Sequence, residues 1–447
     1  MSKLVRIMVC LCMSLFFGSC VFEYPPEMED NDAYVDSDRV VLQINLKPIA
    51  ASESDPSEEV KNPTEKVKSL RVVIIGRGAN PTIPDTIECN RLINVPEMVA
   101  ANYSYTFMWN SKAGNKDIFV IANEGSVDSG LTTLLSGYAE NKQAGDFVEA
   151  VNGYYFSPTY TPDEKNNLYL PYTFSRQNMA PKAGTVNTIN AWLVPVATKF
   201  IFHFINERPN AINVNGISMK YANSENYLFA HLGNEELEKE LNGQPMNWVD
   251  WLAEISKNSW AHPDYSGNIG FNDEVGWIID YKLPNPDDSY VYTFVNENDP
   301  NEFINVPAAE TTIVDGVETT TESRRSTKIF YIPESENFER LGADRTEQSN
   351  PDGDGQNGQE EPEHRFYLTM AFEDTAIPPS TPPEFIDVAI PNLKALFRNT
   401  YVIVTLRMRE GDIEVYAEIA PWNEKTANGW VSEGNAPSGN PFTVRKK

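Results

Sequence analysis

The chain has 447 residues, of which 64 are acidic and 36 basic, so its formal net charge at pH 7 is −28. A nucleic-acid-binding protein needs a basic surface, and the longest basic run here is Arg445, Lys446 and Lys447 at the end of the chain. This pattern argues against nucleic acid as a partner. Hydrophobic residues make up 41% of the chain, which suffices for a sizeable core, and the length predicts more than one domain.

The first 19 residues have the pattern of an export signal. Lys3 and Arg6 precede an apolar run from residue 7 to residue 17, which is too short to cross a bilayer as a helix. Two small residues then directly precede Cys20, an arrangement that resembles the lipobox of bacterial lipoproteins. In such proteins the Cys is acylated and becomes the first residue after cleavage. An ordinary secretory signal with an incidental Cys is the alternative.

Cysteine usage agrees with this interpretation. Removal of residues 1–19 leaves Cys20 and Cys89, and a lipid such as palmitate on Cys20 leaves no pair for a disulfide. Loss of Lys3 and Arg6 takes the net charge from −28 to −30. We interpret residues 20–33 as a tether. Its acidic residues resemble the stretch that directs lipoproteins of Bacteroidetes to the outer face of the outer membrane: Glu23, Glu27, Glu29 and Asp30.

The first predicted strand spans residues 40–46. Its apolar residues alternate with more polar ones, the period-two pattern of a strand with one buried face. These apolar residues are Val40, Leu42, Ile44 and Leu46. Residues 50–66 are polar and predict a long exposed loop.

Further strands recur along the first half of the chain, at residues 70–75, 117–122, 168–174, 191–196 and 199–205. The helical spacing of Leu131, Leu134 and Leu135 predicts one short helix packed outside a sheet. The second half repeats the alternating pattern at residues 217–221, 290–295, 328–332, 365–372, 401–408 and 413–419, with a hairpin turn at 410–412.

Two β-sandwiches, split near residue 208, account for this pattern better than one very large one. We therefore expect domains at residues 34–207 and 208–422, followed by a tail at 423–447. Residues 311–326 predict a polar hairpin or loop. An amphipathic helix is expected near Trp248 and Trp251.

Residues suited to chemistry are scarce, so we expect no enzyme and no cofactor besides the lipid. No two of the four His have the spacing of a zinc helix, and no nucleophile or phosphate-loop motif occurs. His203, inside a predicted strand, is expected to face solvent or to satisfy a hydrogen bond in the core.

An acidic loop is the one weak candidate for a metal site. The loop could bind Ca²⁺ through side-chain oxygen atoms of four residues: Asp352, Asp354, Gln356 and Glu363. Asn357 stands where an EF-hand needs Gly, and a solvated loop is the ordinary identity of such a run.

Several segments together resemble the fimbrillin family of Bacteroidales, the subunits of type V pili. They are the lipobox at Cys20, the strand at 40–46, residues 69–75, 118–123, 193–206, 330–335 and 398–404, and residues 419–422. The resemblance implies an all-β fold of two tandem transthyretin-like β-sandwich domains with a few short helices in loops. In stalk subunits of this family a protease cuts after an Arg behind the first strand. The vacated groove then accepts a C-terminal strand of the next subunit.

On this resemblance the first strand is a plug, with Val40, Leu42, Ile44 and Leu46 facing the groove. A permanent sheet edge is the alternative. No Arg lies between Arg39 and Arg71, so the candidate processing sites are lysines: Lys47 and Lys61, with Lys66 and Lys68 also in the loop. A subunit that keeps its plug and lipid would act as an anchor, whereas cleavage after Lys would give a stalk subunit, and a tip subunit would lack a donor.

The donor strand could lie at residues 430–431 or 441–445, or the hairpin at 401–419 could supply the pairing. The leading hypothesis is a structural subunit of a surface fimbria that contributes to adhesion. Its partners would be other subunits, through β-strand addition, and the outer membrane, through lipid. The alternative is a surface glycan-binding lipoprotein that stacks sugars on aromatic side chains: Trp248, Trp251, Trp260, Tyr265 or Tyr281.

Overall fold

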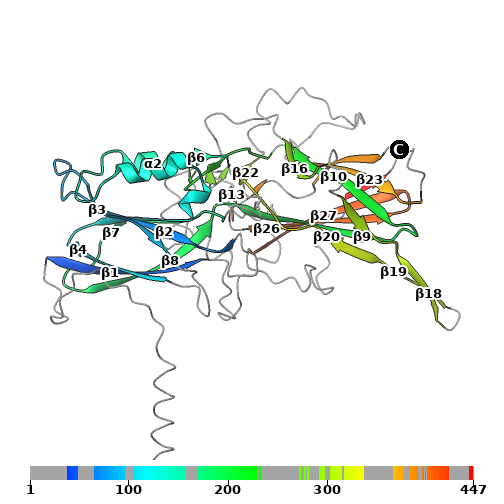
Figure 1. Cartoon of the computed structure of the whole chain (residues 1–447), viewed down its shortest axis with the longest axis horizontal. Coiled ribbons are helices and arrows are strands. Elements are labelled where there is room, and N and C mark those ends of the chain that lie inside the picture. The colour runs from blue at the N-terminus through cyan, green and yellow to red at the C-terminus, as the bar shows by residue number, and fades with distance from the viewer. Residues whose placement is uncertain are drawn as a thin grey trace, which may run out of the picture.

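A computed structural model describes residues 38–48, 65–95, 105–157, 169–220, 222–229, 231–232, 271–272, 276–277, 279–280, 291–296, 303–314, 317–336, 366–376, 383–390, 395–396, 398, 400–421 and 442–445. The fold is all-β, as expected, and the helices of the described part are short. Figure 1 shows the N-terminal sheets toward one end of the long axis and the C-terminal sheets toward the other.

One continuous path of seven strands forms the first sandwich. Its order is β3 (Thr86–Asn94), β2 (Ser69–Gly76), β5 (Lys116–Ala122), β7 (Tyr172–Met179), β8 (Val186–Pro195), β1 (Arg39–Pro48) and β4 (Tyr105–Lys112). Only two residue pairs join β7 to β8. The path turns at this corner, and residues from both sides of it share one hydrophobic core.

The two central strands of this sandwich are covered on both faces. Every residue of β5 is buried, as are the seven residues after Ser69 in β2, which explains why both read as continuous apolar runs rather than alternating ones. Their second face meets α2 (Ser129–Gly137), α3 (Phe147–Asn152) and the pair Leu228 and Phe229. The helix expected from the leucine spacing is α2, and it begins where the side chain of Asp128 accepts a hydrogen bond from the amide of Leu131.

The second sandwich packs two sheets around a core rich in Phe. One sheet has the order β16 (Val291–Val295), β10 (Ile212–Lys220), β23 (Tyr367–Asp374) and β24 (Glu384–Ala389), with β17 (Ile304–Val306) also on β10. The other has β20 (Ser323–Ser326) and β21 (Phe330–Ile332) on β9 (Thr198–Asn206), followed by β26 (Thr400–Arg409), β27 (Asp412–Pro421) and β28 (Phe442–Arg445).

The start of the second sandwich differs from the division expected near residue 208. β9 lies before that position, yet it pairs in parallel with β26 along eight residues. Phe200, Phe202 and Phe204 of β9 belong to the core of the second sandwich. The pairing therefore changes from the first sandwich to the second between β8 and β9.

The remaining strands form short pairs. The hairpin of β18 (Glu310–Val314) and β19 (Val317–Thr321) lies within the polar segment for which a hairpin or loop was expected. The other pairs are β6 (Tyr155–Phe156) with β11 (Asn226–Tyr227), β12 (His231–Leu232) with β15 (Ile279–Asp280), β13 (Phe271–Asn272) with β14 (Gly276–Trp277), and β22 (Ser335–Glu336) with β25 (Ala395–Leu396).

Candidate strand-exchange site

The first strand, β1, lies inside a sheet. It pairs antiparallel with β4, from Arg39 opposite Lys112 to Leu46 opposite Tyr105. On its other side it pairs in parallel with β8, from Val41 beside Val186 onward. The expectation of a strand at 40–46 is confirmed, and this strand lies inside the sheet rather than at its edge. β4 pairs with β1 and with no other described strand, so β1 alone joins β4 to the sheet.

The inward face of β1 is completely buried. Val40, Leu42, Ile44 and Leu46 each have 0% exposure and belong to the core of the first sandwich. Burying four aliphatic side chains of this size contributes roughly 6–12 kcal/mol relative to leaving them exposed. A chain without β1 would therefore expose a deep apolar groove bordered by two strand edges.

The outward face of β1 carries two polar side chains, Gln43 and Asn45, that form hydrogen bonds. The side-chain amide of Asn45 donates to Oδ1 of Asn190 at 3.1 Å, and Oγ1 of Thr106 donates to Oδ1 of Asn45 at 3.1 Å. Gln43 also donates to Asn45, at 3.3 Å. A strand that replaces β1 must match an apolar inner face and a polar outer face at once, which fixes its register.

Backbone contacts fix the N-terminal end of β1. The amide of Ala113 donates to the carbonyl of Asp38 at 2.7 Å, and the amide of Gly184 donates to the carbonyl of Arg39 at 2.8 Å. The chain thus enters the sheet at a defined point.

A buried cluster around Glu65 holds the chain where it returns to the first sandwich. Nζ of Lys199 lies 2.9 Å from Oε1 of Glu65, and the hydroxyl of Tyr331 donates to the same oxygen at 2.7 Å. The hydroxyl of Tyr172 donates to the Glu65 carbonyl at 2.8 Å. Burial, together with the nearby Glu65 carboxylate, raises the pKa of Tyr172 and Tyr331. Because Lys199 and Tyr331 come from β9 and β21, this cluster also joins the two sandwiches.

The next residues are held by Asn123, which has a left-handed backbone with φ of 56°. Its side-chain Oδ1 accepts from the amide of Lys68 at 2.8 Å, and its Nδ2 donates to the carbonyl of Lys66 at 2.9 Å. The chain from residue 65 to the start of β2 is therefore fixed by contacts that do not involve β1.

A second buried ion pair ties the sandwiches together. Arg398 is 0% exposed, and its Nε lies 2.8 Å from Oε2 of Glu334 while its Nη2 lies 2.5 Å from Oε1. The same guanidinium donates to the carbonyls of Leu228 and Tyr227 at 3.0 and 2.8 Å. Since Leu228 packs on the outer face of the first sandwich, Arg398 connects the second sandwich to the cover of the first.

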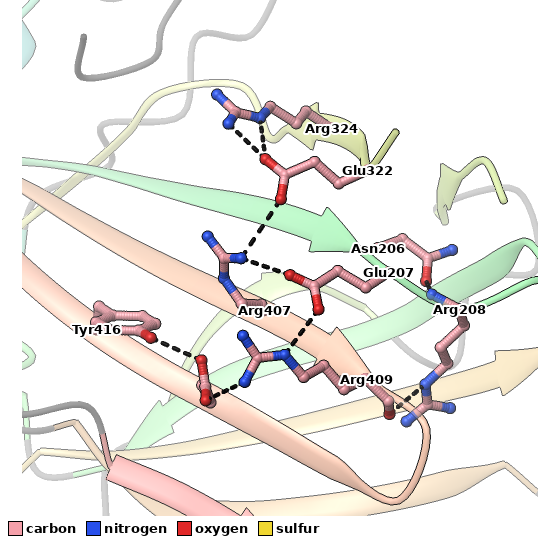
Figure 2. Close-up of polar contacts among 9 residues, drawn as sticks. Asn206, Glu207, Arg208, Glu322, Arg324, Arg407, Arg409 and Tyr416 are labelled. Carbon is pink, nitrogen blue, oxygen red and sulfur yellow. Dashed lines mark hydrogen bonds and ion pairs between the residues drawn. The ribbon is translucent and has the colours of Figure 1, made fainter. Parts of the chain in front are cut away.

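A network of charged side chains lies where β9, β20, β26 and β27 meet (Figure 2). The carboxylate of Glu207 accepts hydrogen bonds from Arg407 at 2.5 Å and from Arg409 at 2.7 Å. Burial opposes the charge on Glu207, but hydrogen bonds from the two arginines outweigh it and hold its pKa below the ordinary value. Arg407 also reaches Glu322 at 3.4 Å, and Arg409 contacts Glu414. The network fixes the end of the β26–β27 hairpin.

Other residues singled out in the sequence do not gather at this site. Lys47 lies within β1, with its backbone beside Trp192 of β8. His203 is buried, and burial followed by the charge of Arg324 lowers its pKa to about 4. The remaining candidates lie outside the described residues: Cys20, Lys61, Asp352, Asp354, Gln356, Glu363, Trp248, Trp251, Trp260, Tyr265 and Tyr281.

The described part of the chain contains no group of three or more His, Cys, Asp or Glu that could hold a metal ion. No helix within it is long and apolar enough to cross a membrane.

Sequence reasoning predicted part of β8 but missed β4, the pairing of β1 with both strands, and the buried charges. β4 was not predicted, and neither were Glu65 with Lys199 and Tyr331 nor Arg398 with Glu334. The isolated acidic or basic residue beside an apolar strand was the available signal for Lys199 and Glu334. This signal does not identify the partner residue, because the partners can be remote in the sequence. Glu65 and Tyr331, for example, are 266 positions apart.

No protein-family model matches the chain, and no curated protein matches it. Among solved structures, it is similar to the tip fimbrial protein Mfa3 from Porphyromonas gingivalis with C-terminal truncation, at 12% identity and a TM-score of 0.41, over 86% of this chain and 100% of that one. It is also similar to a fimbrial assembly protein from Parabacteroides distasonis, at 7% identity and a TM-score of 0.37, over 85% and 94% of the two chains.

Proposed function

We propose that this protein is a structural subunit of a cell-surface fimbria, exported as a lipoprotein and assembled by β-strand addition. The observation that carries the proposal is the place of β1. It is the first strand of the described residues, it lies between two strands that do not pair with each other, and it contributes four completely buried side chains to the core. The motifs at Cys20 and along the chain support the same function. The proposal includes no enzymatic step.

The physical basis is the cost of an open groove. Without β1, the edges of β4 and β8 would have backbone groups without partners, and the apolar core would meet water. A strand supplied by another subunit would satisfy both requirements at once. To repeat the contacts of β1 it must run parallel to β8 and antiparallel to β4.

The position within the fibre depends on whether β1 is kept. The backbone of Lys47 lies in the β1–β8 ladder, and Asn123 holds the backbone of Lys66 and Lys68. A protease needs a segment that can extend into its active site, so these three lysines are poor sites and a stalk role requires a cut at Lys61. A subunit left uncut keeps its plug and lipid and acts as an anchor.

The C-terminal segment is a candidate donor. β28 (Phe442–Arg445) pairs antiparallel with β27 of its own chain, from Asp412 opposite Arg445 to Val415 opposite Phe442. A donor role requires β28 to leave this edge and enter the groove of another subunit.

The mature N-terminus of the protein in sheared surface fibres tests the proposal. Mass spectrometry that finds lipidated Cys20 at the fibre base supports an anchor. A chain that begins directly after Lys61 supports a stalk or tip subunit. Absence of the protein from surface fibres under conditions where it is expressed would refute the proposed function.

A further inference from the structure

The β18–β19 hairpin projects from the body of the protein. Its strands pair with each other, from Glu310 opposite Thr321 to Val314 opposite Val317, and with no other described strand. Figure 1 shows it reaching beyond the second sandwich, at the end of the long axis opposite β1 and β4. Ile313 near its tip is 73% exposed. The hairpin therefore contributes little to the core of its own chain.

Such a ribbon is well suited to pairing with another strand. Its residues are mostly Thr, Val and Ile, which favour strands, and Asp315-Gly316 at the tip favours the tight turn of a two-residue hairpin. An isolated two-stranded hairpin is marginally stable in water, and a third strand stabilises it.

The body holds both legs of the hairpin at its base. Directly before β18, the amide of Ala309 donates to the carbonyl of Arg208 at 3.0 Å. Directly after β19, the Glu322 carboxylate accepts from Arg324 at 2.7 Å and from Arg407 at 3.4 Å, as Figure 2 shows. These contacts fix the direction of the ribbon in advance, which lowers the entropy cost of docking.

A matching edge lies at the other end of the molecule. Among the described strands β4 is the last of its sheet, and Lys112 at its C-terminal end lies opposite Arg39 of β1. Both side chains are exposed, and neither forms an ion pair with a carboxylate in the described part of the chain. Two neighbouring cations repel each other. Residues 310–321 carry Glu310, Asp315 and Glu318 and no basic residue, so the hairpin complements this edge in charge.

We propose that the β18–β19 hairpin is a docking arm that adds to the outer edge of β4 in a second copy of this chain, with its acidic residues near Arg39 and Lys112. The two surfaces lie at opposite ends of the molecule, so the contact is head to tail and its repetition gives an open filament. The arm goes beyond the proposed exchange of β1, because it uses the outer edge of β4 and leaves β1 in place.

Charge-reversal variants of the mature chain in detergent, compared by sedimentation velocity over a range of protein concentrations, test this contact. Arg39→Glu with Lys112→Glu is expected to weaken self-association by about tenfold or more, because it places like charges across the interface. Glu310→Lys with Glu318→Lys is expected to do the same. The chain with all four reversals is expected to regain the original association.

Two further variants keep the result independent of folding. Ile313→Asp changes an exposed tip residue and is expected to weaken association, whereas the matched control Lys142→Glu with Lys182→Glu changes two exposed lysines of the first sandwich and is expected to leave it unchanged. Equal self-association in every variant would refute the proposal that the hairpin is a docking arm. If both paired variants lose self-association and the fourfold variant does not regain it, the proposed pairing of the hairpin with the β4 edge is refuted.

A disulfide lock separates this inference from the proposed function. Gln43 and Met108 are opposite residues of β1 and β4, at the separation of antiparallel partners that a disulfide can span. Gln43→Cys with Met108→Cys holds β1 in place and prevents its exchange, and association through the arm is expected to persist. Loss of association on closing the lock would refute the arm and assign self-association to the groove.

Discussion

Truncation of one side chain in β1 gives a quantitative test of the strand's role. Ile44 lies in the middle of β1, opposite Phe107 of β4 and beside Ile189 of β8, and it is completely buried. Ile44→Ala removes buried carbon atoms and leaves a cavity, which costs about 2–5 kcal/mol. Because β1 is the only described strand that joins β4 to its sheet, this loss should appear in the local opening of β4 and β8.

Native-state hydrogen exchange measures that opening. Amides of β4 are expected to exchange roughly 30- to 4,000-fold faster in Ile44→Ala, from the same 2–5 kcal/mol. Gln43→Ala, next to it on the polar outer face, is the control and should change exchange far less. Amides of β26 in the second sandwich should keep their protection in both variants. Unchanged protection of β4 in Ile44→Ala would refute the argument that β1 holds β4 in the sheet.

Three further predictions concern the buried charges. Arg398→Ala leaves the carboxylate of Glu334 buried without its partner and should lower the free energy of unfolding by about 3–5 kcal/mol, read from chemical denaturation; a loss below about 1 kcal/mol would contradict the contacts described. Glu65→Gln should loosen the start of β2, seen as faster exchange of its first amides, whereas amides of β23 in the other sheet of the second sandwich should be unaffected; equal exchange at β2 would show that the cluster does not hold this segment. His203 has a folded pKa of about 4, below its unfolded value near 6.5, so the unfolded chain binds the proton more readily. The stability linked to the neutral His203 is complete above pH 6.5 and is lost as the pH falls toward 4, which lowers the free energy of unfolding by about 3 kcal/mol in total. A His203→Gln variant with the same pH dependence of unfolding would refute this assignment.

The alternation of apolar residues was sufficient to predict β1 and the side chains it buries. Val40, Leu42, Ile44 and Leu46 recur at a period of two, and only one face of β1 meets the core. The same reasoning predicted β26 and β27 with the turn between them, where Gly411 has a φ of +91°. Local pattern and turn chemistry agree in these segments.

β4 lacks a full apolar face and was not predicted. In β4 the buried side chains are Phe107 and Ser111, and the hydroxyl of Ser111 donates to the carboxylate of Glu88 in β3. Polar residues in this position satisfy each other across strands, so the sequence lacks the alternation that marks a strand. The division of the sandwiches was misplaced for a related reason: β9 is buried at every position, and its pattern does not show which core it joins.

The partners of the buried charges depend on the tertiary fold. Arg398 reaches Glu334 across 64 positions and Leu228 across 170. No local pattern encodes such distances, because strands that are remote in the chain bring the groups together.

Replacement of β1 by an added strand would show whether the first sandwich can exchange this strand. A site-specific protease sequence in place of residues 54–59 would allow β1 to be cut from the folded body, and a fluorescent peptide of residues 38–48 would report entry into the groove by its anisotropy. The peptide is expected to enter after the cut, unlabelled peptide to compete with it, and the closed Gln43→Cys, Met108→Cys lock to prevent entry. A cut chain that does not take up the peptide, or one that takes it up equally with the lock closed, would show that β1 is not exchangeable.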